Sequence, residues 1–369
     1  MDTRTQASVP TPIEDFFRDN REIRQEAKTA AKKRVRGAET VVIGDGDADG
    51  YGALTAVRAV KGWDTPFIAC GYHGGYLHFT DALEIVSEEA QDNADVIVQD
   101  LRLDELWKVE DLERVPASMN ILWFDHHEWD EKMYSYVQEH TDYLEVDTGT
   151  DNPDEDKYNA RCAAQMVRDY FQQSAEYSET INEAIDVTAE YDLWRLRDER
   201  CHDLSDYASI VESPDEYVEA LKQYGADILE STSIREEVEQ YRKNQKALKE
   251  YIISNADVTS INGLDVAIAY GSGPTNDIAE ELRSDYGVGL VCVVYPNGSC
   301  SFRSNESQFE KCHLLAEEFG GGGHAAAAGG SFSHLDSPLE YAEHWCSQGS
   351  EARDILKHTV RDFLERQNT

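Results

Sequence analysis

The chain has 369 residues, with 73 Asp and Glu against 34 Lys and Arg, and its formal net charge is -39. The carboxylates are spread between apolar runs and 40% of the residues are hydrophobic, which excludes a disordered acidic tail and indicates folded domains. Such an acidic surface argues against long-range attraction to nucleic acid and is most stable where salt screens it, so we expect a salt-loving host such as a halophilic archaeon.

The length and the cysteines narrow the class further. Single cores stop growing near roughly 250–300 residues, so we expect two domains. The seven cysteines are odd in number and form no C-x-x-C pair, which indicates neither a disulfide framework nor a zinc ribbon. No secretory signal is recognisable, and the longest apolar run is far shorter than the roughly 20 residues of a membrane helix. We therefore expect a soluble cytoplasmic protein without membrane contact.

A basic helix is predicted near the N-terminus, over residues 11–36. Between Arg18 and Arg36 it carries eight basic residues against three acidic ones. Two interpretations are open, a contact with nucleic acid and a solvated helix face that docks beside the first strand. The second is the commoner origin of such a segment.

Three short apolar runs follow, each bounded like a buried strand and each ending in an acidic residue. They are residues 41–45 (VVIGD), 95–100 (DVIVQD) and 121–125 (ILWFD). Helical patterns lie between them, as after Gly50, where apolar residues recur at the spacing of one helix face. Alternating strands and helices predict an α/β fold with a doubly wound, mainly parallel sheet. Ligands of such sheets bind beyond the carboxyl ends of the strands, where these acids stand.

The stretch GDGDADG, residues 44–50, resembles the opening of a calcium-binding EF-hand loop. If Asp45 takes the first position, Gly50 falls correctly at the sixth. The twelfth position needs a bidentate Glu, however, and it is Ala56. The sequence therefore does not indicate a calcium loop of this kind.

Acids and histidines at the strand ends would converge on one crevice. They are Asp45, Asp47, Asp49, Asp100, Asp125, His126 and His127. A helix N-cap explains a single Asp, but carboxylates at this density repel one another unless cations lie among them. Oxygen ligands with one or two imidazoles suit Mn²⁺ or Mg²⁺. The hypothesis is a hydrolytic site with two metal ions that stabilises an in-line phosphoryl displacement.

The second half of the chain predicts further helices and a smaller α/β domain. Helices are expected over residues 160–173, 178–190, 234–252, 276–286 and 350–366, with a strand over 265–270. The charged helix over 234–252 has the composition of a solvated connection. We therefore divide the chain into a catalytic domain (1–225), a linker helix (226–255) and a substrate-binding domain (256–369).

A hairpin and a glycine-rich run stand out in the substrate-binding domain. Residues 296–298, Pro-Asn-Gly, predict the hairpin, and alternation along its returning strand leaves Arg303 presented rather than buried. A helix then runs into GGGGHAAAAGG, residues 320–330. The amides of glycines 321–323, with His324 and Arg303, are suited to a phosphate, whereas a helix C-cap followed by a flexible loop explains the same run without a ligand.

Taken in order, the motifs resemble those of the DHH phosphoesterase superfamily. The four segments are GDGDADG, the Asp of VIVQD, FDHH and AEYDLW, and FRS followed by GGGGHAAAAGG resembles the family's C-terminal companion domain with its GGGH signature. The likeness covers about residues 38–332. It implies a RecJ-like or nanoRNase-like manganese phosphodiesterase that acts on nucleic-acid ends, short oligonucleotides or nucleotide-type diesters.

The resemblance also implies a role for each metal ligand. Asp47 and Asp49 would each bind one of two manganese ions, and Asp100 would bridge the two. His126 and Asp192 would complete the ligands of the second ion.

Other positions would act on the substrate. The resemblance places His127 near the scissile phosphate and gives Asp125 the task of orienting the histidine pair. Arg303, Gly321, Gly322, Gly323 and His324 match the phosphate-binding residues of the companion domain.

One departure from the family pattern concerns the first metal site. Many relatives carry a histidine four residues, or two residues, before the first Asp of D-x-D, whereas these places hold Ile43 and Asp45 here. Asp45 therefore either replaces that ligand or leaves the first site weaker.

Three functions are weighed. The leading one is an exonuclease or oligonucleotidase that trims single-stranded DNA or RNA, with metal ions bound by the first domain and the terminal phosphate by the second. A nucleotide phosphatase or cyclic-dinucleotide phosphodiesterase would use the same site. A nuclease-dead replication scaffold is the alternative from another class, and the nearly complete ligand set argues against it. Homodimer formation and replication or repair partners are compatible with these functions.

Overall fold

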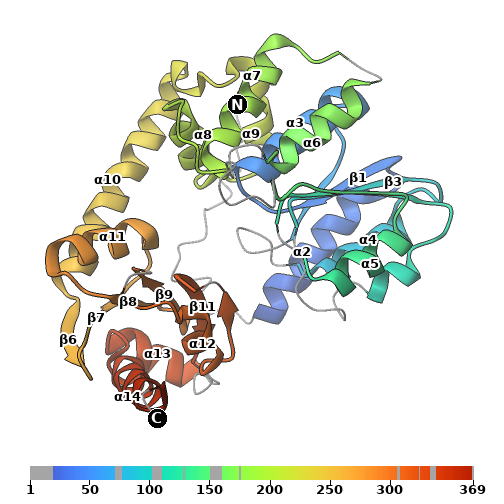
Figure 1. Ribbon diagram of the computed structural model, residues 1–369. Helices are drawn as coiled ribbons and strands as arrows, with labels where there is room; N and C mark the ends of the chain where they lie inside the picture. Colours follow the sequence, from blue (N-terminus) through green and yellow to red (C-terminus); the bar gives the residue numbers. More distant parts are fainter. Residues whose placement is uncertain are drawn as a thin grey trace. The chain divides into compact units, whose positions relative to one another are not determined.

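The computed structural model describes residues 20–70, 77–101, 110–127, 129–149, 160–173, 176–305, 308–323, 325–332 and 338–367. The chain divides into two compact units, Met1–Glu239 and Gln240–Thr369, with the division inside helix α10 (Thr232–Ser254). Each unit has its own sheet and its own helices (Figure 1).

The first unit is built on a five-stranded sheet. Its strands are β1 (Thr40–Gly44), β2 (Phe67–Ala69), β3 (Asp95–Gln99), β4 (Asn120–Asp125) and β5 (Tyr143–Val146). They lie in the order β2-β1-β3-β4-β5, and every neighbouring pair is parallel. The predicted parallel α/β sheet is thus confirmed. The sequence prediction missed β2 and β5, the two short edge strands.

Helices cover both faces of this sheet. The described helical segments are α2 (Asn20–Val35), α3 (Ala48–Lys61), α4 (Phe79–Glu89), η2 (Glu110–Arg114), α5 (Glu131–His140), α6 (Ala163–Gln172), α7 (Glu179–Asp192), α8 (Arg200–Ala208), α9 (Pro214–Tyr224), η4 (Ile228–Glu230) and the first part of α10. Successive side chains of a strand point to opposite faces. Val42 therefore packs into one core with α3 and α6, while Val41 and Ile43 pack into a second core with α4. Burial on both faces explains why these strands are continuous apolar runs.

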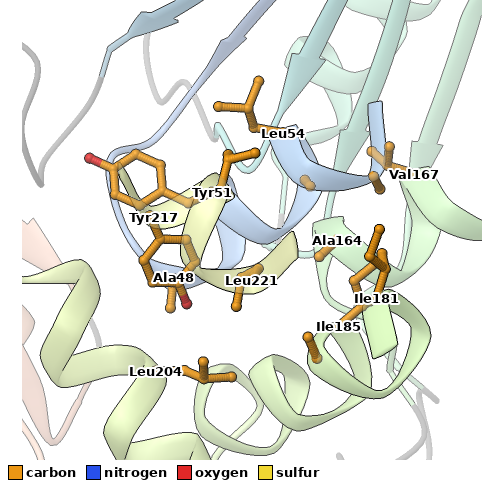
Figure 2. Close-up of a cluster of buried hydrophobic side chains, with 14 of the residues drawn as sticks. Ala48, Tyr51, Leu54, Ala164, Val167, Ile181, Ile185, Leu204, Tyr217 and Leu221 are labelled. Atoms are coloured by element: carbon orange, nitrogen blue, oxygen red, sulfur yellow. The ribbon is translucent and has the colours of Figure 1, made fainter. Parts of the chain in front are cut away.

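Helix α3 is the centre of the first core. Figure 2 shows its side chains Ala48, Tyr51 and Leu54 among residues of α6, α7, α8 and α9. The ring of Tyr51 lies 5.3 Å from that of Tyr217 on α9, which is fully buried. The helix after β1 is thus held by surrounding helices as well as by the sheet, so its N-terminal end is a firm support for side chains.

The basic helix α2 docks on α4, and its basic side chains form ion pairs with acidic residues of α4. Arg24 and Lys28 both contact Asp81, and Lys32 pairs with Glu88 at 2.6 Å. Of the two interpretations of this segment, these contacts favour the docked helix, because the basic side chains are already paired with acids of the same unit.

Strand order places the candidate site. From β1 the chain crosses to β2 on one side, and β3 lies on the other, so the carboxyl ends of β1 and β3 flank the point where the order reverses. Crevices for ligands form at such points because the loops diverge in opposite directions. Asp45 directly follows β1, Asp100 follows β3 and Asp125 ends β4.

The second unit carries a six-stranded sheet in the order β10-β11-β9-β8-β7-β6. Its strands are β6 (Asp257–Ile261), β7 (Leu264–Tyr270), β8 (Leu290–Val294), β9 (Ser299–Ser304), β10 (Gly322–Gly323) and β11 (Ala327–Ser331). Its further helices are α11 (Thr275–Tyr286), α12 (Cys312–Glu317), α13 (Pro338–Cys346) and α14 (Ser350–Gln367). β7 and β8 are parallel and the other pairs are antiparallel, with the predicted hairpin formed by β8 and β9. The prediction of a second, smaller α/β domain is confirmed.

All seven cysteines are free thiols, six of them buried and Cys346 exposed. Within the described ranges, no helix combines the length and the apolar character that a membrane crossing requires.

Candidate metal centre

The GDGDADG loop is the turn from β1 into α3. Asp45 accepts a hydrogen bond from the Gly46 amide at 2.7 Å, and Asp47 caps α3 by accepting one from the Gly50 amide at 2.9 Å. A Cβ atom on Gly50 would lie 2.2 Å from the carbonyl oxygen of Asp45, a distance that no side chain tolerates. The closing glycine of the motif is therefore required by the tight turn itself.

Asp49 has a different environment from Asp47. It stands in the first turn of α3, is 1% exposed, and accepts hydrogen bonds from the backbone amides of Ala163 at 2.7 Å and Ala164 at 2.8 Å. These amides open α6, where unpaired N–H groups and the helix dipole favour a carboxylate. Asp49 therefore ties α3 to α6. The sequence prediction gave it only a metal, and its carboxylate has this second task.

Three side chains from separate elements meet at the carboxyl edge of the sheet. Nε2 of His126, just after β4, lies 3.4 Å from Oδ1 of Asp100 and 3.3 Å from Oδ2 of Asp192, the last residue of α7. Asp100 adopts a left-handed backbone conformation, with φ 50°, and its amide donates to the carbonyl oxygen of Phe124 at 2.9 Å. Three of the positions named by the sequence are thus brought together from β3, β4 and α7.

The acidic side chains of this group raise one another's pKa. Burial, followed by the negative charges of Asp47 and Asp49, raises the pKa of both Asp100 and Asp192 well above the ordinary carboxyl value. Burial also raises the pKa of Asp49, although the nearby His126 lowers it. Without a cation these carboxylates are destabilised in their charged form.

The DHH segment orients its second histidine through a buried carboxylate. Asp125 is fully buried and accepts hydrogen bonds from the His126 amide at 2.9 Å and from Nδ1 of His127 at 2.8 Å. The indole nitrogen of Trp129 donates to its other oxygen. Because Asp125 accepts a hydrogen bond from Nδ1, the neutral His127 ring carries its proton on Nδ1, and its Nε2 is an acceptor. The His127 side chain is 43% exposed and can reach a substrate.

The donor set fits a divalent cation. Possible ligand atoms lie within 4.8 Å of one another in two groups, one of Asp100, His126 and His127 and one of Asp49, Cys162 and Asp192. Oδ2 of Asp192 is buried, and no group within the described residues is oriented to donate a hydrogen bond to it, despite the nearby His126. A buried carboxylate oxygen without a donor is costly, and a bound cation would satisfy it.

Oxygen and imidazole ligands match Mn²⁺ or Mg²⁺. Cys162 adds a sulfur atom that the sequence prediction did not include. Burial and the charge of Asp49 raise the pKa of this thiol well above its usual range, so its protonated form is favoured.

A cavity of about 730 Å³ opens beside these acids within the first unit. Asp47, Asp49 and Asp192 line it together with the aromatic residues Tyr191 and Trp194. Ligand pockets of small molecules commonly measure about 300–1,000 Å³, so the space is of the right size for a nucleotide-sized group.

The predicted phosphate-binding residues lie on the second unit. Arg303 stands on β9 in register with Ala327 of β11, and its guanidinium donates to Asn276 at 2.9 Å and to the carbonyl oxygen of Phe302 at 3.0 Å. Its side chain is half-buried, in agreement with the alternation predicted for this strand. His324 lies outside the described residues.

The glycine run combines a helix end with a strand. Gly320 follows α12 with φ 66°, the left-handed conformation of a helix C-cap, and the amide of Gly321 donates to Ala316 at 3.0 Å. Gly322 and Gly323 then form β10 on β11, where the interpretation without a ligand placed a flexible loop. Close packing accounts for part of the glycine content, because a Cβ atom on Gly321 would lie 1.9 Å from the carbonyl oxygen of Gly329.

Sequence reasoning missed Cys162, Trp129 and Trp194. Trp129 follows the DHH segment closely and Trp194 is the last residue of AEYDLW, so the motifs gave a usable signal for both. Cys162 stands far from every motif, and no local pattern marks it.

Comparison with known proteins places the fold. No protein-family model and no curated protein matches the sequence. Two solved structures share the fold at 14% sequence identity and a TM-score of 0.55 each. One is RecJ from Thermus thermophilus in complex with Mn²⁺, with 88% of this chain and 54% of RecJ covered. The other is the DHH domain of a member of a family of ribosomal proteins, with 94% of this chain and 92% of that domain covered. The present chain therefore spans about half the length of RecJ.

Proposed function

We propose that this protein is a metal-dependent phosphodiesterase of the DHH superfamily that hydrolyses single-stranded nucleic-acid ends or short oligonucleotides. The observation that carries the proposal is the convergence of Asp100, His126 and Asp192 beside the cavity, with a buried oxygen of Asp192 left without a donor. A fold shared with a manganese-bound RecJ supports it.

The ligands of the metal site follow from this arrangement. Asp47, Asp100, His126 and Asp192 would hold divalent cations, Mn²⁺ in the first place with Mg²⁺ as the alternative. Asp49 would join them through whichever lone pairs its hydrogen bonds to α6 leave free. Two such ions would activate a water molecule and neutralise the phosphate oxygens during an in-line displacement. We assign Asp45 to the first metal site, where it would replace the histidine ligand that many relatives carry.

The protein's own groups position the reacting atoms. The buried Asp125 fixes the ring of His127 through Nδ1, so Nε2 of the neutral ring can accept a proton, and the protonated ring can donate from Nε2 to the scissile phosphate. Trp129 limits rotation of the Asp125 carboxylate by its own hydrogen bond. Asp125 thus positions the His127 ring, and His127 is the residue that contacts the substrate.

The second unit would bind a phosphate of the substrate. Arg303, Gly321, Gly322, Gly323 and His324 are the residues we assign to it, by the resemblance of FRS and GGGGH to the companion domain of the family. Gly322 is exposed, and the guanidinium of Arg303 is a donor from which a phosphate oxygen can accept.

The charge of the chain favours small substrates. At a net charge of -39, attraction to long nucleic acid is unfavourable, so end-bound or short substrates are preferred over long duplexes. A nucleotide phosphatase and a cyclic-dinucleotide phosphodiesterase are the alternatives, and the substrate panel described next distinguishes them.

The test offers purified protein a panel of substrates in molar KCl with Mn²⁺ or Mg²⁺. The panel contains end-labelled single-stranded DNA and RNA, oligomers of two to five nucleotides, cyclic dinucleotides and 3′-phosphoadenosine 5′-phosphate. We expect hydrolysis of the short oligomers, loss of activity in Asp100→Asn, and a melting temperature that rises with Mn²⁺ in the wild type but not in Asp100→Asn.

The matched control is Asp95→Asn, at the opposite end of the same strand. Asp95 pairs with Lys61 at 2.7 Å, away from the site, so this variant should keep both activity and the response to Mn²⁺. Hydrolysis of nothing in the panel, or full activity in Asp100→Asn, would reject the proposal.

A further inference from the structure

The cavity beside the metal centre has a composition that a phosphate does not explain. Of the residues that line it, Asp47, Asp49, Asp192 and Glu212 are acidic, and none of the described lining residues is Lys, Arg or His. Four carboxylates without a cationic side chain repel phosphate groups. Beyond the point where a metal ion neutralises the acids, the cavity therefore suits an uncharged part of a ligand.

An aromatic side chain stands at this cavity in a position that core packing does not account for. Trp194 is 57% exposed, although tryptophan is mostly buried in folded proteins. Its ring meets that of Tyr191 edge to face, with the centroids 5.6 Å apart and an angle of 68°. Tyr191 in turn meets the ring of His202 at 5.5 Å. The indole is thus held by an aromatic neighbour, with much of its surface open.

The backbone holds Trp194 in this position. Its φ is 53°, a left-handed conformation that bulky residues seldom adopt, and its amide donates to Tyr191 at 3.0 Å. The amides of the next two residues, Arg195 and Leu196, both donate to the carbonyl oxygen of Glu190, at 2.8 and 2.9 Å. A strained residue fixed by surrounding hydrogen bonds is commonly part of a binding site. The turn that presents the indole directly follows Asp192.

We propose that this cavity is a nucleobase-binding subsite, in which Trp194 stacks on the base of the nucleotide whose phosphate is cleaved. Stacking on an aromatic ring suits every base, since each has a π-face. Ser205, Ser209 and Glu212 line the cavity and can accept hydrogen bonds from the N–H groups of a base edge. The inference rests on the proposed phosphodiesterase function. It adds that the acidic cavity binds the nucleobase of the substrate.

Direct binding tests the subsite without hydrolysis. In EDTA and molar KCl, adenosine should quench tryptophan fluorescence of the wild type, and ribose 5-phosphate should not. Trp194→Phe should remove this quenching. Trp63→Phe is the matched control, because Trp63 is 40% exposed in the same unit but does not line the cavity. Quenching by adenosine that persists in Trp194→Phe would overturn the assignment.

Hydrolysis gives the second readout. The substrates are a dinucleotide and the same molecule with one base replaced by hydrogen. Trp194→Ala should raise KM for the intact dinucleotide about tenfold, with little change in kcat, and Trp194→Phe should restore it. Neither variant should change KM for the abasic molecule, and Trp63→Ala should change neither. An equal rise in KM for both substrates would overturn the subsite.

The two proposals can fail separately. Failure of the wild type to cleave either dinucleotide would reject the phosphodiesterase function, while loss of adenosine quenching in Trp194→Phe would still support a base site. Cleavage of both molecules by Trp194→Ala with unchanged KM would reject the base site and leave the function standing.

Discussion

His126 and Asp192 meet at the carboxyl edge of the first sheet, with Nε2 of the imidazole 3.3 Å from Oδ2 of the carboxylate. The same nitrogen lies 3.4 Å from Asp100. One imidazole between two acids does not offset their mutual repulsion, since the pKa of both carboxyls stays well above the ordinary value. The metal-free protein is therefore destabilised at this point, and it is here that a cation has most to contribute.

Asp100→Asn should stabilise the metal-free protein. A carboxyl whose pKa is raised on folding contributes most at low pH, and this contribution is lost as the pH rises from about 3.9, the ordinary Asp value, through the raised pKa. Above that range the variant should melt about 2–4 °C higher than the wild type for each kcal/mol of repulsion removed. Asn tolerates the left-handed backbone at this position, so strain does not obscure the result.

Calorimetry in EDTA across pH 4 to 8 measures this difference. Asp95→Asn is the control of opposite sign, because hydrogen bonds from Lys61 and Asn120 outweigh burial and lower the pKa of Asp95. That variant should lose stability at neutral pH. A melting temperature of Asp100→Asn below the wild type throughout would contradict the expectation.

Asp49→Ala should destabilise the first unit by about 2–4 kcal/mol, because the amides of Ala163 and Ala164 lose their acceptor in a buried place. Asp49→Asn keeps one acceptor oxygen, so its free energy of unfolding should lie between those of the wild type and Asp49→Ala. Urea unfolding in EDTA measures the free energy of unfolding. Asp47→Ala is the comparison, since Asp47 caps α3 with a single bond and should lose only about 1 kcal/mol. Equal losses at both positions would show that Asp49 has no special task in holding α6.

Asp125→Asn should lower kcat about 10- to 100-fold with little change in KM, because an amide cannot accept from both His127 and Trp129. Nitrogen NMR of the imidazole should show that His127 no longer prefers the Nδ1–H tautomer. Trp129→Phe removes one donor and leaves the His127 contact, so its effect should be smaller. A tautomer that stays unchanged in Asp125→Asn would refute the orienting role.

Asp81→Asn should loosen helix α2. Burial raises the pKa of Asp81, but hydrogen bonds from Arg24 and Lys28 outweigh this and lower it to about 2. The stabilisation is therefore present above about pH 3.9, the unfolded value, and is lost as the pH falls towards 2. Wild type and variant should differ in melting temperature at pH 7 and converge at acid pH. Glu84→Gln, which removes an exposed partner of Lys28, should change stability by less than about 1 kcal/mol.

The sequence alone determined the parallel sheet and most of the acids of the site. Apolar runs such as residues 121–125 mark strands that are buried on both faces, and an acid after such a run lies at the ligand edge of a parallel sheet. Asp100 and His126 could be named because each stands at the end of an apolar run, and Asp192 because AEYDLW resembles a motif of the DHH superfamily; both are local features of the chain. The hairpin between β8 and β9 was predicted for the same reason, from Pro296, Asn297 and Gly298.

Only the tertiary structure decided what these residues touch. Asp49 caps α6 through Ala163 and Ala164, which lie far along the chain, and the pairing of β10 with β11 depends on close backbone packing at Gly321 and Gly323. The cavity that Trp194 lines arises where α3, α7, α8 and the start of α9 meet. Local patterns encode burial and turns, whereas the partners of a buried carboxylate or an exposed indole are set by the packing of distant elements, which no short stretch of sequence contains.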